Sequence, residues 1–249
     1  MTIRGKSAIV FKPTLNITEQ IADHLAELVI CGELKGGTRI QEIKIANELG
    51  VSRGSVREAL LILERRYLID IMPRKGAVVN HLDGQDAVEL VDMLAAIERR
   101  RFHHVISNQK SRENLAAAEA SLVAMEAAAR AGQLDDLLGA RKDFYDILLS
   151  DATRYMQGVF ECLLPSSQRL IRSLMEQAGV DLYDIARYYR ALFCALDAAD
   201  RARLDELLNA FHKRLLTLCS KTFGDFNQRA SGQRDASPMQ AGARNLEAR

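Results

Sequence analysis

The spacing of hydrophobic residues changes near residue 80 and divides the chain into two parts. Before that point, apolar side chains recur every three or four residues in three segments, which predicts three amphipathic helices. Residues that favour helix ends mark where each helix starts and stops. The expected helices run from Asn16 or Thr18 to near Gly32, from about Gln41 to Leu49, and from the cap Ser52 to roughly Arg66.

After the third helix the pattern becomes that of short β-strands. Residues 68–72 and 77–80 are mostly apolar, and Pro-Arg-Lys-Gly at residues 73–76 joins them. Two such runs with a turn between them favour a β-hairpin. Three helices followed by a hairpin predict a winged helix-turn-helix domain, which we place at residues 1–80.

Residues 81–223 show helical spacing throughout, with short breaks such as Gly132 and Gly179. Six or seven helices with short connections predict an all-α bundle, so the expected fold class is mainly α. From Gly224 the chain has almost no bulky apolar residue, which predicts a disordered tail over residues 224–249. The helices expected in the bundle span residues 86–104, 112–131, 133–149, 156–177, 182–196 and 201–222.

Composition and charge narrow the possible settings. No apolar run is long enough to span a bilayer, and the N-terminus lacks the apolar core of a signal peptide. The four cysteines are scattered singly, which predicts a cytoplasmic protein without disulfides or a membrane partner. Residues 1–80 hold 12 Lys/Arg and 9 Asp/Glu, whereas residues 81–223 hold 18 and 21. The basic excess near the N-terminus indicates where a polyanion would bind.

The most specific motif lies between residues 45 and 60. Gly50 allows a tight turn, and Ser52 caps the next helix, whose N-terminal end is the part that enters a DNA major groove. Arg53 and Arg57 are four residues apart and therefore lie on one helical face, opposite the apolar face. Arginine is suited to bidentate contact with guanine or phosphate.

Two small residues, Gly54 and Ser55, would let the same helix approach the DNA closely. The alternative interpretation is an amphipathic helix with two solvated arginines. The ordered sequence of turn, cap, core and hairpin favours DNA binding instead.

Other residues near this motif are weaker candidates for DNA contact. Arg74, Lys75 and Gly76 lie at the tip of the predicted hairpin, where they would reach phosphates or the minor groove. Arg39 and Lys44 are candidates for phosphate contact. Each of these basic residues has the alternative of being a solvated surface charge.

With this motif the sequence resembles the GntR family of transcription factors, in the branch with an all-helical effector domain (the FadR/FCD type). Residues 52–60 read Ser-Arg-Gly-Ser-Val-Arg-Glu-Ala-Leu, where the family usually has Ser-Arg-Thr-Pro-Val-Arg-Glu-Ala-Leu. Residues 76–79 resemble the usual wing. Gly54-Ser55 replaces Thr-Pro, Gly36-Gly37 replaces Pro-Gly, and Tyr67 replaces a customary Gly. The first departure puts the usual operator sequence in doubt.

The resemblance also implies a metal site that this sequence does not provide. Many members of this branch bind a divalent metal through one Asp and three His. In this chain Arg141 stands at the place of the Asp, and Tyr145 and Tyr189 stand at the places of two His. The last His corresponds to Phe211 or His212. At most one ligand remains, so we expect neither a metal nor another cofactor.

The residues that replace the ligands suggest another chemistry. Arg141 and Tyr145 share one helix face, and Tyr189 and His212 would join them from other helices. A guanidinium and phenol hydroxyls would receive a carboxylate directly, which predicts a small organic acid as effector. The alternative is that Arg141 pairs with Asp143 or another acid and the tyrosines pack with satisfied hydroxyls.

Two further features are interpreted as structural. The run Arg99-Arg100-Arg101 is expected to be a solvated face, from which one arginine could face the cavity. Cys162, Cys194 and Cys219 are expected to behave as small apolar residues.

Together these observations predict a ligand-responsive transcriptional repressor and not an enzyme, because no catalytic motif is present. One helix-turn-helix contacts few bases, so a homodimer on a palindromic operator of double-stranded DNA is expected. Two alternatives remain open: a metal-dependent sensor with a rearranged site, and a dimeric DNA-binding protein without an effector.

Overall fold

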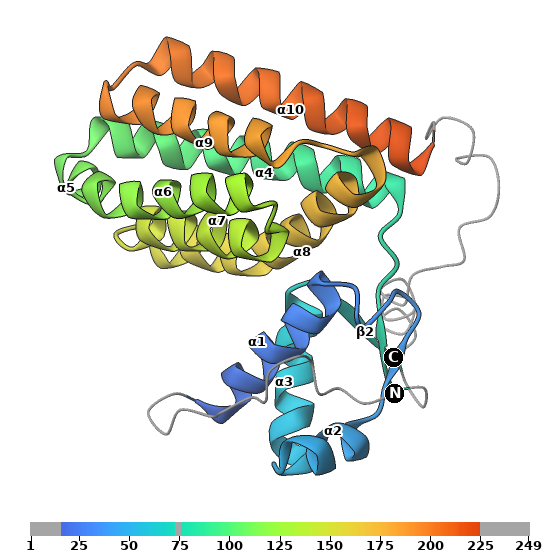
Figure 1. Cartoon of the computed structure of the whole chain (residues 1–249). Helices are drawn as coiled ribbons and strands as arrows, with labels where there is room; N and C mark the ends of the chain where they lie inside the picture. Colours follow the sequence, from blue (N-terminus) through green and yellow to red (C-terminus); the bar gives the residue numbers. More distant parts are fainter. Residues whose placement is uncertain (1–15, 73–75, 225–249) are drawn as a thin grey trace, which may run out of the picture.

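The computed structural model describes residues 16–72 and 76–224, which form a small N-terminal domain and a helical C-terminal domain (Figure 1). The N-terminal domain contains three helices and a three-stranded sheet. Its elements are α1 Ile17–Ile30, β1 Arg39–Ile40, α2 Glu42–Leu49, α3 Arg53–Arg65, β2 Ile69–Met72 and β3 Gly76–Val79. The predicted winged helix-turn-helix is confirmed.

The caps of these helices follow from the sequence. Asn16 accepts a hydrogen bond from the backbone N–H of Thr18 at 3.0 Å and begins α1. Gly50 ends α2 with φ of 67°, a left-handed conformation that glycine adopts without a Cβ clash. The core of the domain is apolar and includes Ile21, Leu25 and Leu63.

The sheet contains one strand that the hydrophobic pattern did not predict. Strand β3 lies in the centre and pairs antiparallel with both β1 and β2. Strand β1 has only two residues, Arg39 opposite Val78 and Ile40 opposite Ala77. Two residues are too few to show alternation, so its pairing depends on the hairpin beside it.

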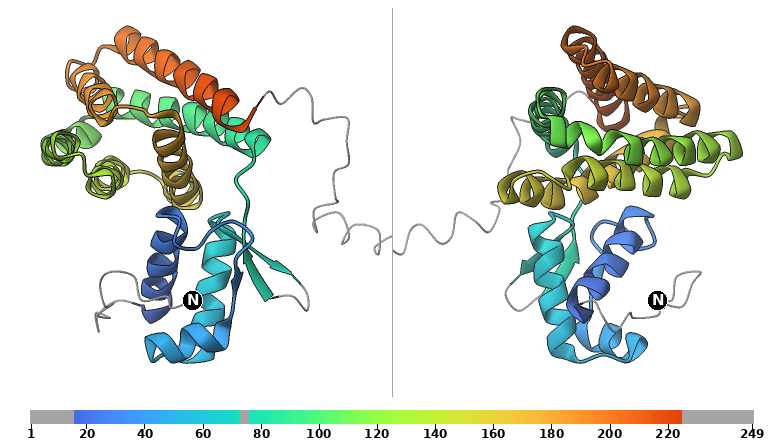
Figure 2. Two further views of the ribbon diagram at one scale, coloured as in Figure 1. Left: turned by 45° about the vertical axis from the view of Figure 1, so that its right-hand side comes forward. Right: turned by 90° about the vertical axis from the view of Figure 1, so that its left-hand side faces the viewer.

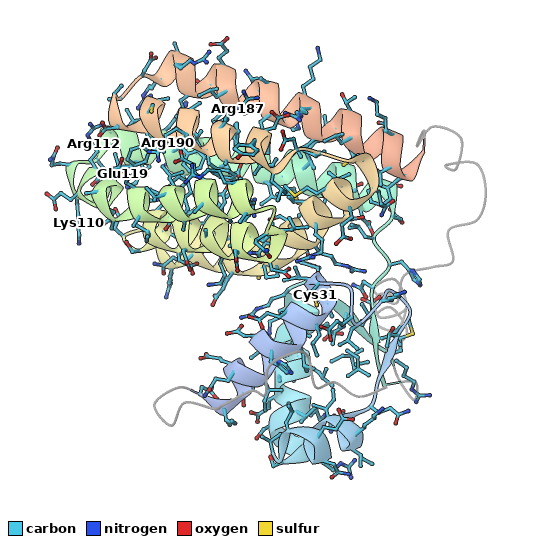
Figure 3. All side chains as sticks on the ribbon, viewed as in Figure 1. Cys31, Lys110, Arg112, Glu119, Arg187 and Arg190 are labelled. Carbon is cyan, nitrogen blue, oxygen red and sulfur yellow. The ribbon has the colours of Figure 1, made fainter. Side chains whose placement is uncertain are left out.

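The C-terminal domain consists of seven helices in the described residues, which agrees with the predicted bundle. One predicted helix, over residues 112–131, is divided at Asn114 into α5 and α6. Arg190 of α9 connects α9 to α6 through ion pairs with Glu126 at 2.7 Å and Glu119 at 3.4 Å (Figure 3). The helices are α4 Gly84–Ser107, α5 Gln109–Glu113, α6 Leu115–Ala131, α7 Leu134–Leu149, α8 Arg154–Ala178, α9 Leu182–Asp197 and α10 Arg201–Phe223.

The two domains meet through α1, the end of α3 and α8 (Figure 2). Ser166 Oγ of α8 donates a hydrogen bond to the backbone carbonyl of Arg66 at 2.9 Å. Arg169 of the same helix donates to the backbone carbonyl of Asn80 at 2.7 Å. The opposite end of α3, together with α2, lies at the end of the molecule farthest from the bundle (Figure 1).

Two structural expectations need correction. Arg101 is buried and not solvated, because its guanidinium pairs with Asp151 and binds the carbonyl of Leu148. Cys194 is exposed, so the small-apolar interpretation is wrong for that cysteine. None of the described helices is long and apolar enough to cross a membrane. The predicted tail lies outside the described residues, apart from Gly224.

Candidate functional site

The N-terminal end of α3 presents its two arginines to solvent. Ser52 Oγ accepts the backbone N–H of Ser55 at 3.0 Å, and the two hydroxyls lie 2.8 Å apart. Arg53 and Arg57 are exposed. The opposite face of the helix is buried through Val56, Ala59, Leu60 and Leu63. The guanidinium groups are therefore available to a partner without any change in the core.

Gly54 lies between these arginines on the same exposed surface. A Cβ added there would meet only Ser52 Oγ, at 3.7 Å, so the fold itself does not require glycine at this position. The absence of a side chain leaves the backbone of the first turn accessible to a neighbouring surface.

The structure brings together some of the weaker candidates for DNA contact. Arg39 is exposed on β1, and a Cβ placed at Gly76 would lie 3.9 Å from Arg39 Nε. Lys44 on α2 is half-buried and lies 3.9 Å from Glu48. Arg74 and Lys75 lie outside the described residues. Arg39 therefore lies beside the first residue of the returning strand of the wing.

A second group of candidate residues forms a hydrogen-bonded network inside the bundle. Arg141 of α7 donates from Nε to the Tyr189 hydroxyl at 2.5 Å and from a terminal nitrogen to Ser167 Oγ at 3.3 Å. The hydroxyls of Tyr145 and Tyr189 lie 3.1 Å apart, and Tyr145 donates to the carboxylate of Glu98. We call Glu98, Arg141, Tyr145, Ser167 and Tyr189 the buried network; all five residues are buried.

Three of the four predicted effector residues belong to this network, and the fourth lies at its edge. His212 borders the same small cavity as Glu98 and Arg141 but is partly exposed, and its Nε2 lies 2.6 Å from Asp92. Phe211, the other residue considered for that place, stacks on Tyr188 with ring centroids 3.8 Å apart. The cavity measures about 30 Å³, which is room for one or two water molecules.

Two members of the network were not identified from the sequence. Glu98 lies on the same face of α4 as the buried Val91 and Leu94. Helical spacing therefore places this carboxylate on an apolar face, where a charged residue is unusual and indicates a polar partner in the core. Ser167 gave no signal, because a serine is common on both buried and exposed helix faces. Arg141 does not pair with Asp143, which is exposed.

Burial and neighbouring charges change the pKa values of the titratable groups in the network. Burial raises the pKa of Glu98, and the nearby Arg141 only partly opposes this effect. Burial also raises the pKa of Tyr145 and Tyr189, so both phenols stay neutral. Burial acts to lower the pKa of Arg141, but its neighbours Tyr189, Tyr145 and Glu98 raise the value overall. Within the described residues, no Asp or Glu lies within ion-pairing distance of Arg141.

The network does not fit the metal site of the FCD type. A buried guanidinium repels a divalent cation, and neutral tyrosines are poor ligands for zinc, nickel or manganese. In the part of the chain that the structure describes, no group of three or more His, Cys, Asp or Glu side chains could hold a metal ion.

Comparison with known proteins agrees with the N-terminal geometry. Residues 17–79 match the family model described as bacterial regulatory proteins, gntR family. The HTH-type transcriptional regulator YdhC of Bacillus subtilis, itself described as uncharacterized, is 27% identical over 144 residues, 57% of this chain and 64% of the relative. The gluconate operon transcriptional repressor of Bacillus subtilis is 34% identical over 87 residues, 35% of each chain. The alignments thus span less than two thirds of either relative.

Solved structures share the fold of both domains. The E. coli protein McbR/YncC superposes with a TM-score of 0.71 at 20% identity, covering 85% of this chain and all of that one. A Rhodococcus sp. RHA1 protein described as a GntR transcriptional regulator superposes with a TM-score of 0.68 at 19% identity, covering 82% of this chain and 97% of its own. At such identities the comparison shows the fold alone.

Proposed function

We propose that the protein is a ligand-responsive transcriptional repressor of the GntR family that binds a specific DNA sequence; the match of residues 17–79 to the model of this family supports the proposal. The observation that carries this proposal is the exposed N-terminal end of α3. Arg53 and Arg57 project from it, while the rest of the helix is fixed in an apolar core. An N-terminal helix end with free guanidinium groups fits the edges of bases in a major groove. Action on the chromosome would place the protein in the cytoplasm.

The protein acts as a homodimer in this proposal. One α3 helix reads only a few base pairs, which gives too little discrimination against the rest of a genome. Two copies related by a two-fold axis double the contacts and require a palindromic operator.

The effector is a small carboxylate that binds at the buried network. Arg141 is a buried cation, and among the described residues no Asp or Glu lies within ion-pairing distance of it. An incoming carboxylate would supply the missing negative charge and a strong bidentate acceptor. Because the cavity now measures about 30 Å³, binding requires the stacked Tyr188 and Phe211 or the Glu98 side chain to move.

Helix α8 provides a direct connection between the effector site and the DNA-binding domain. Ser167 binds Arg141 of the network, and the adjacent Ser166 binds the backbone carbonyl of Arg66 at the end of α3. Pro165 precedes both serines inside the helix and removes one helical hydrogen bond there. A shift of this segment on effector binding would therefore move the end of α3.

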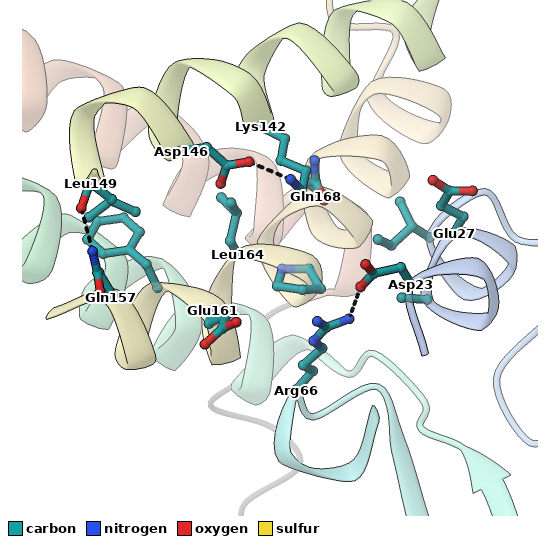
Figure 4. A pocket seen from close by; sticks show the side chains of 14 residues that line it. Asp23, Glu27, Arg66, Lys142, Asp146, Leu149, Gln157, Glu161, Leu164 and Gln168 are labelled. Atoms are coloured by element: carbon teal, nitrogen blue, oxygen red, sulfur yellow. Dashed lines mark hydrogen bonds and ion pairs between the residues drawn. The ribbon is translucent and has the colours of Figure 1, made fainter. Parts of the chain in front are cut away.

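The junction has room for such a movement. A groove of about 670 Å³ lies between α1 and α8, bordered by Pro165, Leu164 and Gln168 on one side (Figure 4). On the other side, Arg66 pairs with Asp23 of α1 at 2.6 Å. The Arg66 guanidinium thus joins the end of α3 to α1 within the DNA-binding domain, and the Arg66 carbonyl joins this domain to α8 of the bundle.

The first test is binding of the purified protein to the DNA upstream of its own gene, measured by fluorescence anisotropy over a salt series with competitor DNA. We expect binding that resists competitor and weakens steeply with salt. Arg57→Ala should abolish the DNA binding that resists competitor. Arg65→Ala, which removes an exposed charge from the other end of α3, should leave it unchanged. Equal effects of the two variants would contradict the assignment of α3 as the recognition helix.

The effector is tested separately with Arg141→Ala. A thermal-shift screen of organic acids should identify a ligand that stabilises the wild type, and the same ligand should alter DNA affinity. The variant should bind DNA while losing the response, with circular dichroism as the check on folding. An unaltered response would remove Arg141 from the effector site.

Two observations favour a second candidate function. The small volume of the cavity and the completed hydrogen bonds of the network fit a DNA-binding dimer whose bundle takes no effector. No stabilisation by any acid in a broad library would support that function over the first.

A further inference from the structure

A larger cavity, of about 250 Å³, lies at the junction between the two domains and apart from the buried network. Tyr67 and Asn80 border it from the DNA-binding domain, directly after α3 and β3. Residues of α4 and α8 border it from the bundle. Its volume is below the roughly 300–1,000 Å³ of sites for drug-sized ligands, so it suits a smaller metabolite.

Arg169 of α8 gives this cavity a positive charge without a counter-ion. Its guanidinium donates to the backbone carbonyl of Asn80, a neutral acceptor, at 2.7 Å. In the described residues no carboxylate lies within ion-pairing distance of it. Arg169 is partly buried, and this burial lowers the pKa of its guanidinium. A partly buried guanidinium in this position is a site for an anion.

The wall formed by α4 has the opposite character. Asp86 and Glu89 border the cavity and are exposed; neither pairs with a basic side chain among the described residues, and Glu89 accepts a hydrogen bond from Gln85 Nε2 at 3.0 Å. Burial raises the pKa of Asp86, followed by the nearby carboxylates Asp83 and Glu89. In addition, Asn80 Oδ1 is buried and accepts no hydrogen bond. A buried acceptor without a donor beside two carboxylates without a counter-ion favours a ligand group that donates hydrogen bonds and carries positive charge.

The remaining surface is apolar and includes a strained residue. Leu90, Met93 and Leu163 border the cavity, and Met93 is 47% exposed. Tyr67 has a φ of 56° and is 63% exposed. A left-handed conformation costs a non-glycine residue about 1 kcal/mol or more, and the exposed ring recovers little of this by burial. Strain of this kind at the edge of a cavity is typical of a residue kept for contact with a ligand.

We propose that this junction cavity binds a free α-amino acid with an apolar side chain. The carboxylate binds Arg169, the ammonium group binds the Asp86, Glu89 and Asn80 acceptors, and the side chain packs on Leu90, Met93 and Leu163. A zwitterion is the ligand class that satisfies both charged walls at once. Such a ligand would join Tyr67 and Asn80 to α4 and α8 and so fix the orientation of the DNA-binding domain; this consequence rests on the proposed function.

Isothermal titration calorimetry of the full chain tests the site without DNA. L-leucine and L-methionine are the probes, and 4-methylpentanoate and 3-methylbutylamine are leucine fragments that lack the ammonium and the carboxylate. We expect each fragment to bind about tenfold or more weakly than leucine, because each loses one charged hydrogen-bonded contact. Arg169→Gln should weaken leucine by a similar factor and change 3-methylbutylamine little. Arg187→Gln, an exposed charge on α9, is the matched control.

The site is overturned if neither amino acid produces heat at millimolar concentration, or if Arg169→Gln binds leucine as the wild type does while its thermal unfolding is normal. The link to DNA is measured separately, by anisotropy with and without leucine. Leucine binding with unchanged DNA affinity would retain the site and remove its regulatory role. Leucine binding in a protein that binds no DNA would instead contradict the proposed function.

Discussion

The two domains place arginine in opposite environments. In the N-terminal domain Arg53 and Arg57 are exposed, and the core beneath them is apolar. In the bundle Arg101 and Arg141 are each 2% exposed and bound by neighbouring helices. An exposed arginine costs the fold little and remains available to a partner, whereas a buried one must be satisfied within the protein. Substitutions in the two places should therefore separate binding from stability.

The largest effect is expected for Arg101→Ala. This change removes the counter-ion of the buried Asp151 carboxylate, which keeps hydrogen bonds from Ser111 and Asn114, and it should lower the free energy of unfolding by about 3–5 kcal/mol. Urea denaturation followed by circular dichroism measures the loss. The double variant R101M/D151N should lose less, since no uncompensated charge remains. A loss below about 1 kcal/mol for Arg101→Ala would show that the pair behaves as a surface salt bridge.

Arg53→Ala should give the reverse pattern. We expect the free energy of unfolding to stay within about 0.5 kcal/mol of the wild type, because the side chain is exposed. Operator affinity should fall by about 1–3 kcal/mol for each protomer that loses its contact. The free energy of unfolding, from urea denaturation, and the operator affinity, from fluorescence anisotropy, are measured in the same buffer. A destabilised variant with normal operator binding would remove the contrast between the domains.

A smaller effect, of opposite sign, is expected for Tyr67→Gly. Glycine relieves the left-handed strain, so the free energy of unfolding should rise by about 0.5–1 kcal/mol. Tyr67→Ala, which removes the ring but keeps the strain, should bring no such gain. If the alanine variant is stabilised as much as the glycine variant, the strain lies in the ring contacts and not in the backbone.

The smallest expected effect depends on pH and concerns Glu98→Gln. In acid the protonated Glu98 resembles glutamine, so wild type and variant should differ little in stability there. Burial raises the pKa of Glu98 above its ordinary value of 4.5, so the folded protein holds a proton that the unfolded chain loses as the pH rises. This residue's contribution to stability is therefore fully present below pH 4.5 and is lost as the pH rises through the folded pKa. The variant should show a flatter stability curve above that pH, measured as Tm against pH. A steeper curve would mean that ionised Glu98 stabilises the fold through Arg141.

The helix-turn-helix and its exposed arginines could be predicted from the sequence because their determinants are local. The turn at Gly50, the cap at Ser52 and the spacing of Arg53 and Arg57 all act within one or two helical turns. The strand β1 could not be predicted, since two residues carry no period and their partner in β3 lies far along the chain.

The buried network shows where sequence reasoning reached its limit. Arg141, Tyr145 and Tyr189 were found only by their correspondence with a family pattern, and Glu98 was missed although it lies on the apolar face of α4. Tyr145 and Glu98 are 47 residues apart in sequence and meet because α4 and α7 contribute to one core. Helical spacing predicts that a side chain faces the core, but it does not predict which side chain it contacts there.

The sequence by itself determined the helices, the wing and the exposed arginines, because spacing, capping and turn chemistry act between neighbours in the chain. Only the tertiary structure decided which polar groups are satisfied and which are not. Arg169 and Asn80 lie 89 residues apart, and the cavity beside them exists because the two domains meet at that point. Burial and the distances between helices set the charge and the room at such a place, and both depend on the packing of the whole chain.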